Sequence, residues 1–233
     1  MGCVLYTKIS GKNLNPEEAV VSGFVTVEIV SFVLNELVMA VHDFAFTDGT
    51  SGKIAFNGLV YTATTGFANC LVNVNLLSGA VTNGFFQFDT GAFFSSLSIL
   101  SIDAVEFFYV EALAQPSTPP DIMEVYIGDF IGAALNGNAG EFNGGTFMLD
   151  AVVYGWLGNS NAFYNLADDG ADPTPFINLT GTTDIRFKHD TTAGSNGRAF
   201  NTTKGKCLLR VTYTLASRIR DVVTFVGVVP FKR

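Results

Sequence analysis

The sequence is poor in charge and in the residues that enzymes most often use for catalysis. Charged residues make up 15% of the 233 residues, against about 25% in an average soluble domain. The two histidines, His42 and His189, each lack a second histidine or a cysteine nearby, so no zinc-binding spacing forms locally. The Gly-x-Ser-x-Gly and Gly-x-x-x-x-Gly-Lys motifs are also missing. We therefore predict no enzymatic activity and no cofactor; a hydrolase would need His42 or His189 in a cleft beside a nucleophile.

Cysteine is scarce, and its placement argues against a disulfide framework. Cys3, Cys70 and Cys207 are odd in number and widely separated, which favours buried free thiols over disulfides or a metal site. The N-terminus lacks the basic region and apolar core of a signal peptide. Glu28 and Glu36 interrupt the longest apolar stretch, so no transmembrane segment is predicted. The default expectation is synthesis in a cytoplasm.

The residues that are abundant indicate β structure. The chain has 22 Phe and 24 Gly together with many Val, Thr and Asn, a combination of strand formers and turn formers. Polar and apolar residues alternate over residues 184–188 and 208–215, which predicts half-buried strands. Other stretches are apolar at every position, which is typical of sheets covered on both faces. The predicted fold class is all-β, an antiparallel β-sandwich or jelly roll.

A proline-rich stretch near the middle of the chain is the best candidate for a boundary. Residues 116–120 contain three prolines, which cannot lie in a central strand. The predicted organisation is an N-terminal β-sandwich half over residues 1–115, a connection over 116–120 and a C-terminal half over 121–233. The alternative is one large jelly roll whose two sides are joined by this connection.

Charge is divided unevenly along the chain. Residues 1–185 hold three Lys and Arg against 19 Asp and Glu, whereas residues 186–233 hold ten against two. An acidic body and a basic C-terminal quarter favour association with copies of the same chain or with an acidic protein partner, although the two parts can also neutralise each other within one fold. The acidic body disfavours nucleic acid. The candidate assembly contacts are Arg186, Lys188, Arg198, Lys204, Lys206, Arg218 and Arg220.

A turn-rich region over residues 158–175 is the only candidate for ligand binding. Trp156 and Tyr164 border or occupy it, and an exposed aromatic platform there is suited to stacking against a sugar. The alternative is that these aromatic residues anchor the loop to the core. Asp168 and Asp169 offer oxygen atoms to a cation, but the spacing of a calcium-binding loop is missing, so a solvated acidic loop without a metal is expected.

The composition and strand pattern, as in Ser101 to Val110 and Leu208 to Leu215, resemble those of virus and bacteriophage virion proteins. Such proteins include jelly-roll capsid subunits, capsid-decorating cement proteins and tail components. The resemblance implies a structural role in a virion, through self-association, for example as a trimer, and through contacts with other virion proteins. It carries no family motif and assigns no residues. The alternative is a lectin-like module that binds a glycan or receptor through the 158–175 loop.

Overall fold

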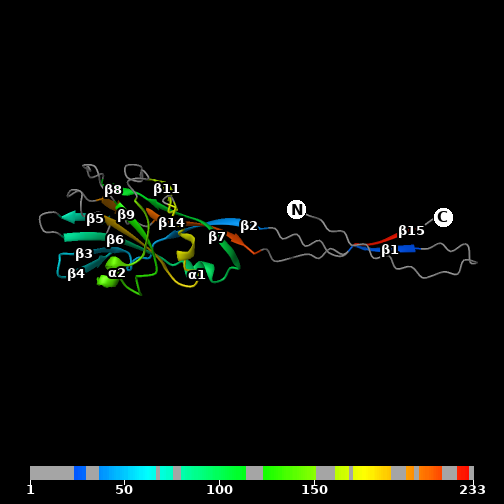
Figure 1. Ribbon diagram of the computed structural model, residues 1–233, viewed down its shortest axis with the longest axis horizontal. Coiled ribbons are helices and arrows are strands. Elements are labelled where there is room, and N and C mark those ends of the chain that lie inside the picture. Colours follow the sequence, from blue (N-terminus) through cyan, green and yellow to red (C-terminus); the bar gives the residue numbers. More distant parts are fainter. Residues whose placement is uncertain are drawn as a thin grey trace, which may run out of the picture. The chain divides into compact units, whose positions relative to one another are not determined.

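A computed structural model describes most of the chain. It covers residues 24–29, 37–66, 69–75, 80–113, 123–150, 161–167, 170–189, 198–201, 205–216 and 225–230. The chain divides into two compact units: residues 38–216, called the body below, and the two terminal segments 1–37 and 217–233 taken together (Figure 1). Residues 116–120, the predicted connection, lie outside the described residues.

The body is built from antiparallel strands, which confirms the predicted all-β sandwich. One sheet has four strands in the order β11-β7-β14-β2, and the other has nine. The four strands of the smaller sheet are β2 (Val38–Ala45), β7 (Ile99–Tyr109), β11 (Ala162–Asn165) and β14 (Cys207–Leu215). Both sheets contain strands from before and after residues 116–120, so the two halves of the sequence share the same two sheets.

The larger sheet branches at its central strand, β6. Its strands are β3 (Gly52–Phe56), β4 (Tyr61–Thr65), β5 (Asn69–Asn75), β6 (Ala80–Phe88), β8 (Glu111–Leu113), β9 (Met123–Gly128), β10 (Thr146–Asp150), β12 (Thr183–His189) and β13 (Arg198–Asn201). On one side, β6 pairs with β3, which pairs with β4. On the other side of β6, β5 pairs with the first residues of β6 and β12 pairs with its last residues.

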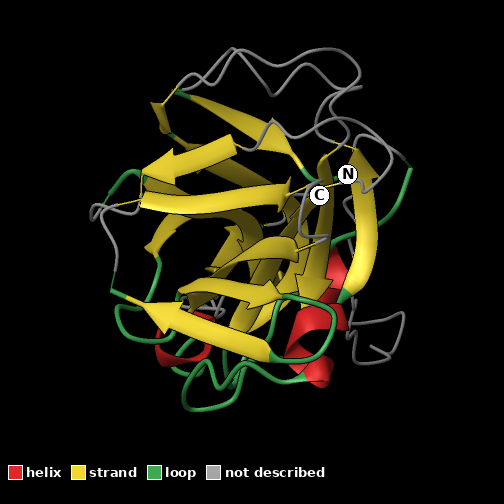
Figure 2. Ribbon diagram, turned by 90° about the vertical axis from the view of Figure 1, so that its left-hand side faces the viewer, coloured by secondary structure: helices red, strands yellow, loops and turns green. Residues whose placement is uncertain are grey.

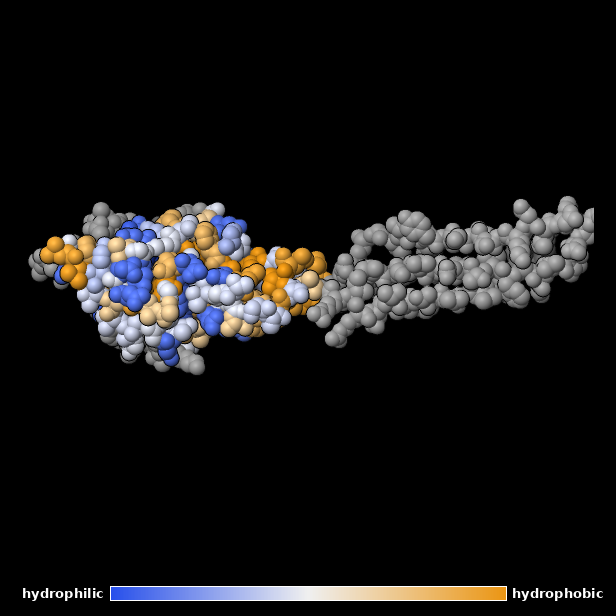
Figure 3. All heavy atoms as spheres, turned by 90° about the horizontal axis from the view of Figure 1, so that it is seen from below, coloured by the Kyte–Doolittle hydropathy of each residue, from blue (hydrophilic) through white to orange (hydrophobic). Residues whose placement is uncertain are grey.

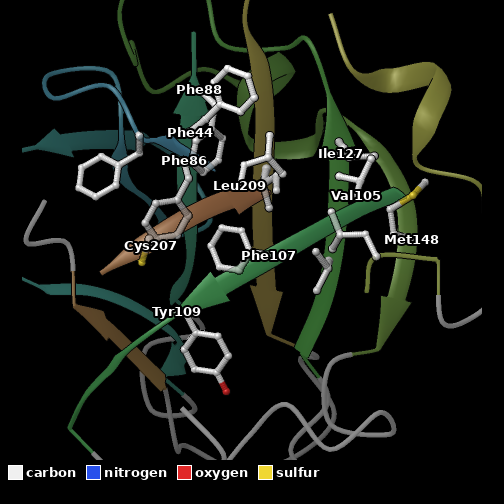
Figure 4. Packing of buried hydrophobic residues seen from close by; sticks show 14 of the residues in the cluster. Phe44, Phe86, Phe88, Val105, Phe107, Tyr109, Ile127, Met148, Cys207 and Leu209 are labelled. Carbon is white, nitrogen blue, oxygen red and sulfur yellow. The ribbon is translucent and has the colours of Figure 1, made fainter. Parts of the chain in front are cut away.

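The main core lies between the two sheets (Figure 2), and aromatic rings from several strands pack together in it (Figure 4). Phe107 of β7 lies 5.7 Å from Phe86 of β6 and 5.1 Å from Phe187 of β12, measured between ring centroids. Alternation along β14 buries Cys207, which is one of the predicted buried thiols. Phenylalanine is abundant in this sequence because facing strands of both sheets contribute rings to the same layer.

A second, smaller core covers the opposite face of the larger sheet. Residues 129–145, which contain the short helix α2 (Ala139–Asn143), cover Ile54 of β3 and Phe85 of β6. The covering residues include Ile131, Leu135 and Phe142. Both faces of β6 and β12 are therefore buried, and the second cover comes from the same chain. For β12 this corrects the half-buried strand predicted from alternation over residues 184–188, because the 129–145 segment covers the face that carries Asp184 and Arg186.

The body contains two further helical segments. Helix α1 (Thr90–Phe94) begins at Asp89, whose carboxylate accepts the backbone N–H of Ala92 at 3.1 Å. The 3-10 helix η1 (Thr174–Phe176) lies in the region that the sequence predicts as an exposed loop.

Two expectations about local structure were wrong. The apolar and strand-forming residues over 53–62 predict one strand, but the structure has β3 and β4 there with a turn between them, because Gly58 adopts φ +91° and the Asn57 side chain accepts the backbone N–H of Leu59 and Val60. The 158–175 region contains strand β11, which pairs with β7. The short length of β11 and the polar residues around it hid its strand character.

The terminal segments contribute one pair of strands. Strand β1 (Phe24–Ile29) pairs antiparallel with β15 (Phe225–Pro230), from Phe24 opposite Pro230 to Ile29 opposite Phe225. Both ends of the chain thus take part in one two-stranded ribbon.

Candidate interaction surfaces

Buried polar side chains hold the covering segment 129–145 against the larger sheet. Gln87 donates its side-chain N–H to the carbonyl of Ile131 at 2.9 Å. Asn83 and Arg186 both donate to the carbonyl of Phe142. The covering segment is largely irregular, so its backbone groups need partners from outside the segment. Asn83, Gln87 and Arg186 supply such partners. Their role is to hold the covering segment in place.

Asp184 holds the beginning of the same segment. One of its carboxylate oxygens, Oδ2, accepts the backbone N–H groups of Phe130 at 2.7 Å and Ile131 at 2.6 Å. Burial raises the pKa of Asp184 to about 6, with a smaller contribution in the same direction from the nearby charge of Asp129, and outweighs the opposing effect of the hydrogen bonds from Ile131, Phe130 and Gln87. The carboxylate is therefore held at an energetic cost when it is charged.

Glu141 organises the other end of the covering segment. Its buried carboxylate accepts backbone N–H groups from Asn136, Gly137 and Asn138 at 2.7 to 3.3 Å. The side chain of Asn138 in turn accepts the backbone N–H of Glu141, which completes a capping box at the start of α2. The loop before α2 is thus folded around one carboxylate.

The predicted basic assembly contacts lie in different places. Arg186 is 3% exposed, and its guanidinium carbon lies 3.9 Å from the centre of the Tyr126 ring. Lys188 donates to the Glu124 carboxylate at 2.6 Å. Lys206 is exposed just before β14, in the other sheet. The side chain of Arg198, on β13, and residues Lys204, Arg218 and Arg220 lie outside the described part of the chain.

The structure assembles a charged and aromatic cluster on the outward face of the four-stranded sheet. Arg210 of β14 donates two hydrogen bonds to the Asp43 carboxylate of β2, at 2.7 and 2.9 Å. Its guanidinium carbon lies 3.5 Å from the centre of the Phe163 ring, which lies 5.1 Å from the Phe108 ring. Alternation along β14 predicts an outward Arg210, but not its partners from β2 and β11, which are distant in sequence.

An apolar patch lies where β2 begins. Its four members are called the β2 patch below, and their side chains are 48 to 70% exposed: Val38, Met39, Val41 and Leu100. Among the strands that the structure describes, β2 lies at the edge of its sheet, and β14 separates it from β7, which carries Leu100. Figure 3 shows apolar surface gathered at this end of the body. The sequence does not predict this patch, because an apolar residue in a strand gives the same local sequence pattern whether its side chain is buried or exposed.

The candidate ligand loop is only partly described. Tyr164 lies on β11, half-buried, with its ring 5.8 Å from that of Tyr109, and burial raises its pKa. This packing is the anchoring role that the sequence analysis gave as the alternative to glycan stacking. Trp156, Asp168 and Asp169 lie outside the described residues. The lectin-like alternative stays a prediction.

The histidines are separated in the structure. His42 stacks on Phe93 with ring centroids 3.8 Å apart, whereas His189 is buried at the end of β12. In the part of the chain that the structure describes, no three His, Cys, Asp or Glu side chains are grouped so that they can hold a metal ion. No helix among the same residues is long and apolar enough to cross a membrane.

Comparisons with known proteins leave the family open. The sequence matches no protein-family model, and no curated protein shows significant similarity to it. The fold and the surfaces described above are therefore the basis for inferring a function.

Proposed function

We propose that this protein is a structural subunit that acts by protein–protein assembly in a virion, as a capsid decoration or capsid jelly-roll subunit. The β2 patch is the observation that carries the proposal. Single exposed apolar residues are common on soluble proteins, but three members of the patch lie within four consecutive residues, 38–41, at the beginning of β2, with Met39 and Val41 on one face of the strand and Val38 on the other. Apolar side chains exposed on both faces of the same strand end favour a contact with another protein.

The character of β2 as an edge strand supports the same conclusion. Exposed edges are usually protected against pairing by lysine, proline, bulges or short length. β2 is eight residues long, contains neither lysine nor proline and pairs with β14 without a register shift. Asp43 is its only acidic residue and is already paired with Arg210. An edge with so little protection is suited to a permanent partner, which for this protein would be another copy or another virion protein.

The virion setting rests on the resemblance in composition and strand pattern. Only 15% of the residues are charged, and a surface with few charges suits a subunit that is largely covered in an assembly. The setting is tested separately, by mass spectrometry of purified particles from the source of the sequence. Stoichiometric amounts of this chain in the particles are expected, and its absence would overturn the setting.

The assembly role is tested by the mass of the native protein in solution. We expect light scattering after size exclusion to give a multiple of the 24.9 kDa chain mass. The double variant Met39→Lys with Val41→Lys places two charges in the β2 patch and is expected to lower that mass. Thr62→Lys is the matched control, since Thr62 is an exposed strand residue of the other sheet. A wild-type protein that stays monomeric at high concentration would overturn the proposal.

A further inference from the structure

The outward face of the four-stranded sheet is organised in rows that cross all four strands. Residues directly opposite each other in an antiparallel pair lie on the same face of the sheet. The register places a polar row on this face: Asp43 of β2, Arg210 of β14, Glu106 of β7 and Asn165 of β11. The neighbouring row is apolar and crosses the same strands: Ala45, Leu208, Phe108 and Phe163.

This face is accessible, but it is unlike the usual solvated face of an antiparallel sheet, which is polar. The members of both rows are exposed or half-buried, whereas the residues between them, such as Phe44, Leu209 and Phe107, are buried in the main core. On the other side of the polar row lie Val41 and Met39 of the β2 patch, 55% and 70% exposed. Apolar side chains on both sides of the polar row favour a partner that covers this face.

The charges in the polar row alternate in sign across the sheet. Arg210 lies between two carboxylates: its hydrogen bonds to Asp43 raise its pKa, and the charge of Glu106 contributes in the same direction. The order of charges is therefore negative at Asp43, positive at Arg210, negative at Glu106 and neutral at Asn165. A partner that covers this face must present charges in a matching order.

We propose that a second copy of this chain covers this face, about a two-fold axis that runs parallel to the strands above the middle of the sheet, between β7 and β14. The inference rests on the proposed assembly role and specifies the partner and the surface. The rotation places β7 over β14 of the other copy and β11 over β2, and each row lies over the same row. Sheets that pack face to face keep their strand directions within about 30° of each other, which this axis satisfies.

The rows are complementary to themselves under this rotation. Arg210 of each copy faces Glu106 of the other, Asp43 faces Asn165, and the apolar row meets the apolar row. A two-fold axis along the polar row would instead place every strand over itself, with Arg210 facing Arg210 and Glu106 facing Glu106. Like charges opposed across an interface are unfavourable, so the alternation of charge selects the axis parallel to the strands. The contact is isologous and gives a dimer.

The test exchanges charges between two variants of the full chain. Glu106→Lys brings a lysine opposite Arg210 of the other copy, and Arg210→Glu brings a glutamate opposite Glu106. Each variant alone opposes like charges twice and is expected to be monomeric, whereas the wild type is expected to have twice the 24.9 kDa chain mass. In an equimolar mixture the introduced lysine faces the introduced glutamate, and Arg210 faces Glu106 as in the wild type. The mixture is therefore expected to recover the dimer.

Light scattering after size exclusion gives the masses, and thermal unfolding shows whether each variant is folded. Asp48→Lys is the matched control, because Asp48 is exposed in the turn between β2 and β3; it is expected to keep the wild-type mass. Chemical labelling of carboxylates supplies a measurement on the wild type alone. Labelling of Glu106 is expected to fall as the protein concentration rises and the dimer forms, while labelling of Asp48 stays constant.

Several outcomes overturn the two-fold contact and leave the assembly role standing. They are a dimer in both variants, a mixture of the two folded variants that stays monomeric, and equal labelling of Glu106 in the monomer and the dimer. A wild-type trimer is another, because an isologous contact joins copies in pairs. A monomeric wild type overturns both the two-fold contact and the proposed assembly role.

Discussion

The carboxylate of Asp184 accepts the backbone N–H of Ile131 at 2.6 Å, across 53 residues of sequence. This contact joins β12, at the centre of the larger sheet, to the segment that covers the sheet's outer face. The covering segment lacks a sheet or long helix of its own over most of its length. Its position therefore depends on a small number of side chains that bind its backbone, and these side chains are where substitutions should have the clearest effects.

Asp184 should make stability depend on pH in a defined direction. Its pKa rises from 3.8 to about 6 on folding, so the folded state binds the proton more tightly than the unfolded state does. The resulting stabilisation is fully present below about pH 4 and is lost as pH rises through about 6. A difference of roughly two units between the pKa of Asp184 in the folded and unfolded states corresponds to about 3 kcal/mol of stability.

The measurement is urea unfolding of the wild type and Asp184→Asn between pH 4 and pH 7.5. The asparagine is neutral throughout, so the difference between the two proteins isolates the Asp184 carboxyl. The wild type should gain stability relative to the variant as the pH falls. Parallel pH profiles for the two proteins would contradict this assignment.

Glu141→Ala should destabilise the body by about 1 to 3 kcal/mol. The substitution removes the carboxylate that accepts the backbone N–H groups of Asn136, Gly137 and Asn138, and hydrogen bonds to charged groups make net contributions of this size. Asn143→Ala in the same helix is the control, because Asn143 is exposed and bonds only the carbonyl of Ala139. The free energy of unfolding checks the prediction, which fails if the two variants are equally stable.

Gly91→Ala should destabilise the protein even though alanine is the better helix former. A Cβ at Gly91 would lie 2.3 Å from the backbone nitrogen of Gly181 and 2.3 Å from the carbonyl carbon of Thr180. The backbone of α1 or of the loop at Thr180 and Gly181 must then move, and α1 loses its close approach to this loop before β12.

Gly132→Ala is the matched control for that substitution. A Cβ at Gly132 meets no atom within 4 Å, so this change is expected to be neutral or to stabilise by up to about 1 kcal/mol through the unfolded chain. Thermal unfolding of both variants is the measurement. A Gly91→Ala variant as stable as Gly132→Ala would show that α1 is not held closely against that loop.

The sequence by itself determined the fold class and the faces of the most regular strands. Leu209 and Val211 are buried and Arg210 points outward because alternation along a strand is a local property that the order of residues records directly. The burial of Cys207 follows from the same alternation. The all-β character follows from the composition and the turn residues, which are also local properties of the sequence.

Only the tertiary structure decided what covers each face. Nothing near Asp184 or Arg186 in the sequence shows that both lie under the 129–145 segment, and nothing near Met39 shows that its strand is an edge. An apolar or charged residue on a strand has the same local pattern whether its neighbour is water, the same chain or another protein. That neighbour is set by the order of strands in the sheets, which depends on contacts between residues far apart in the chain.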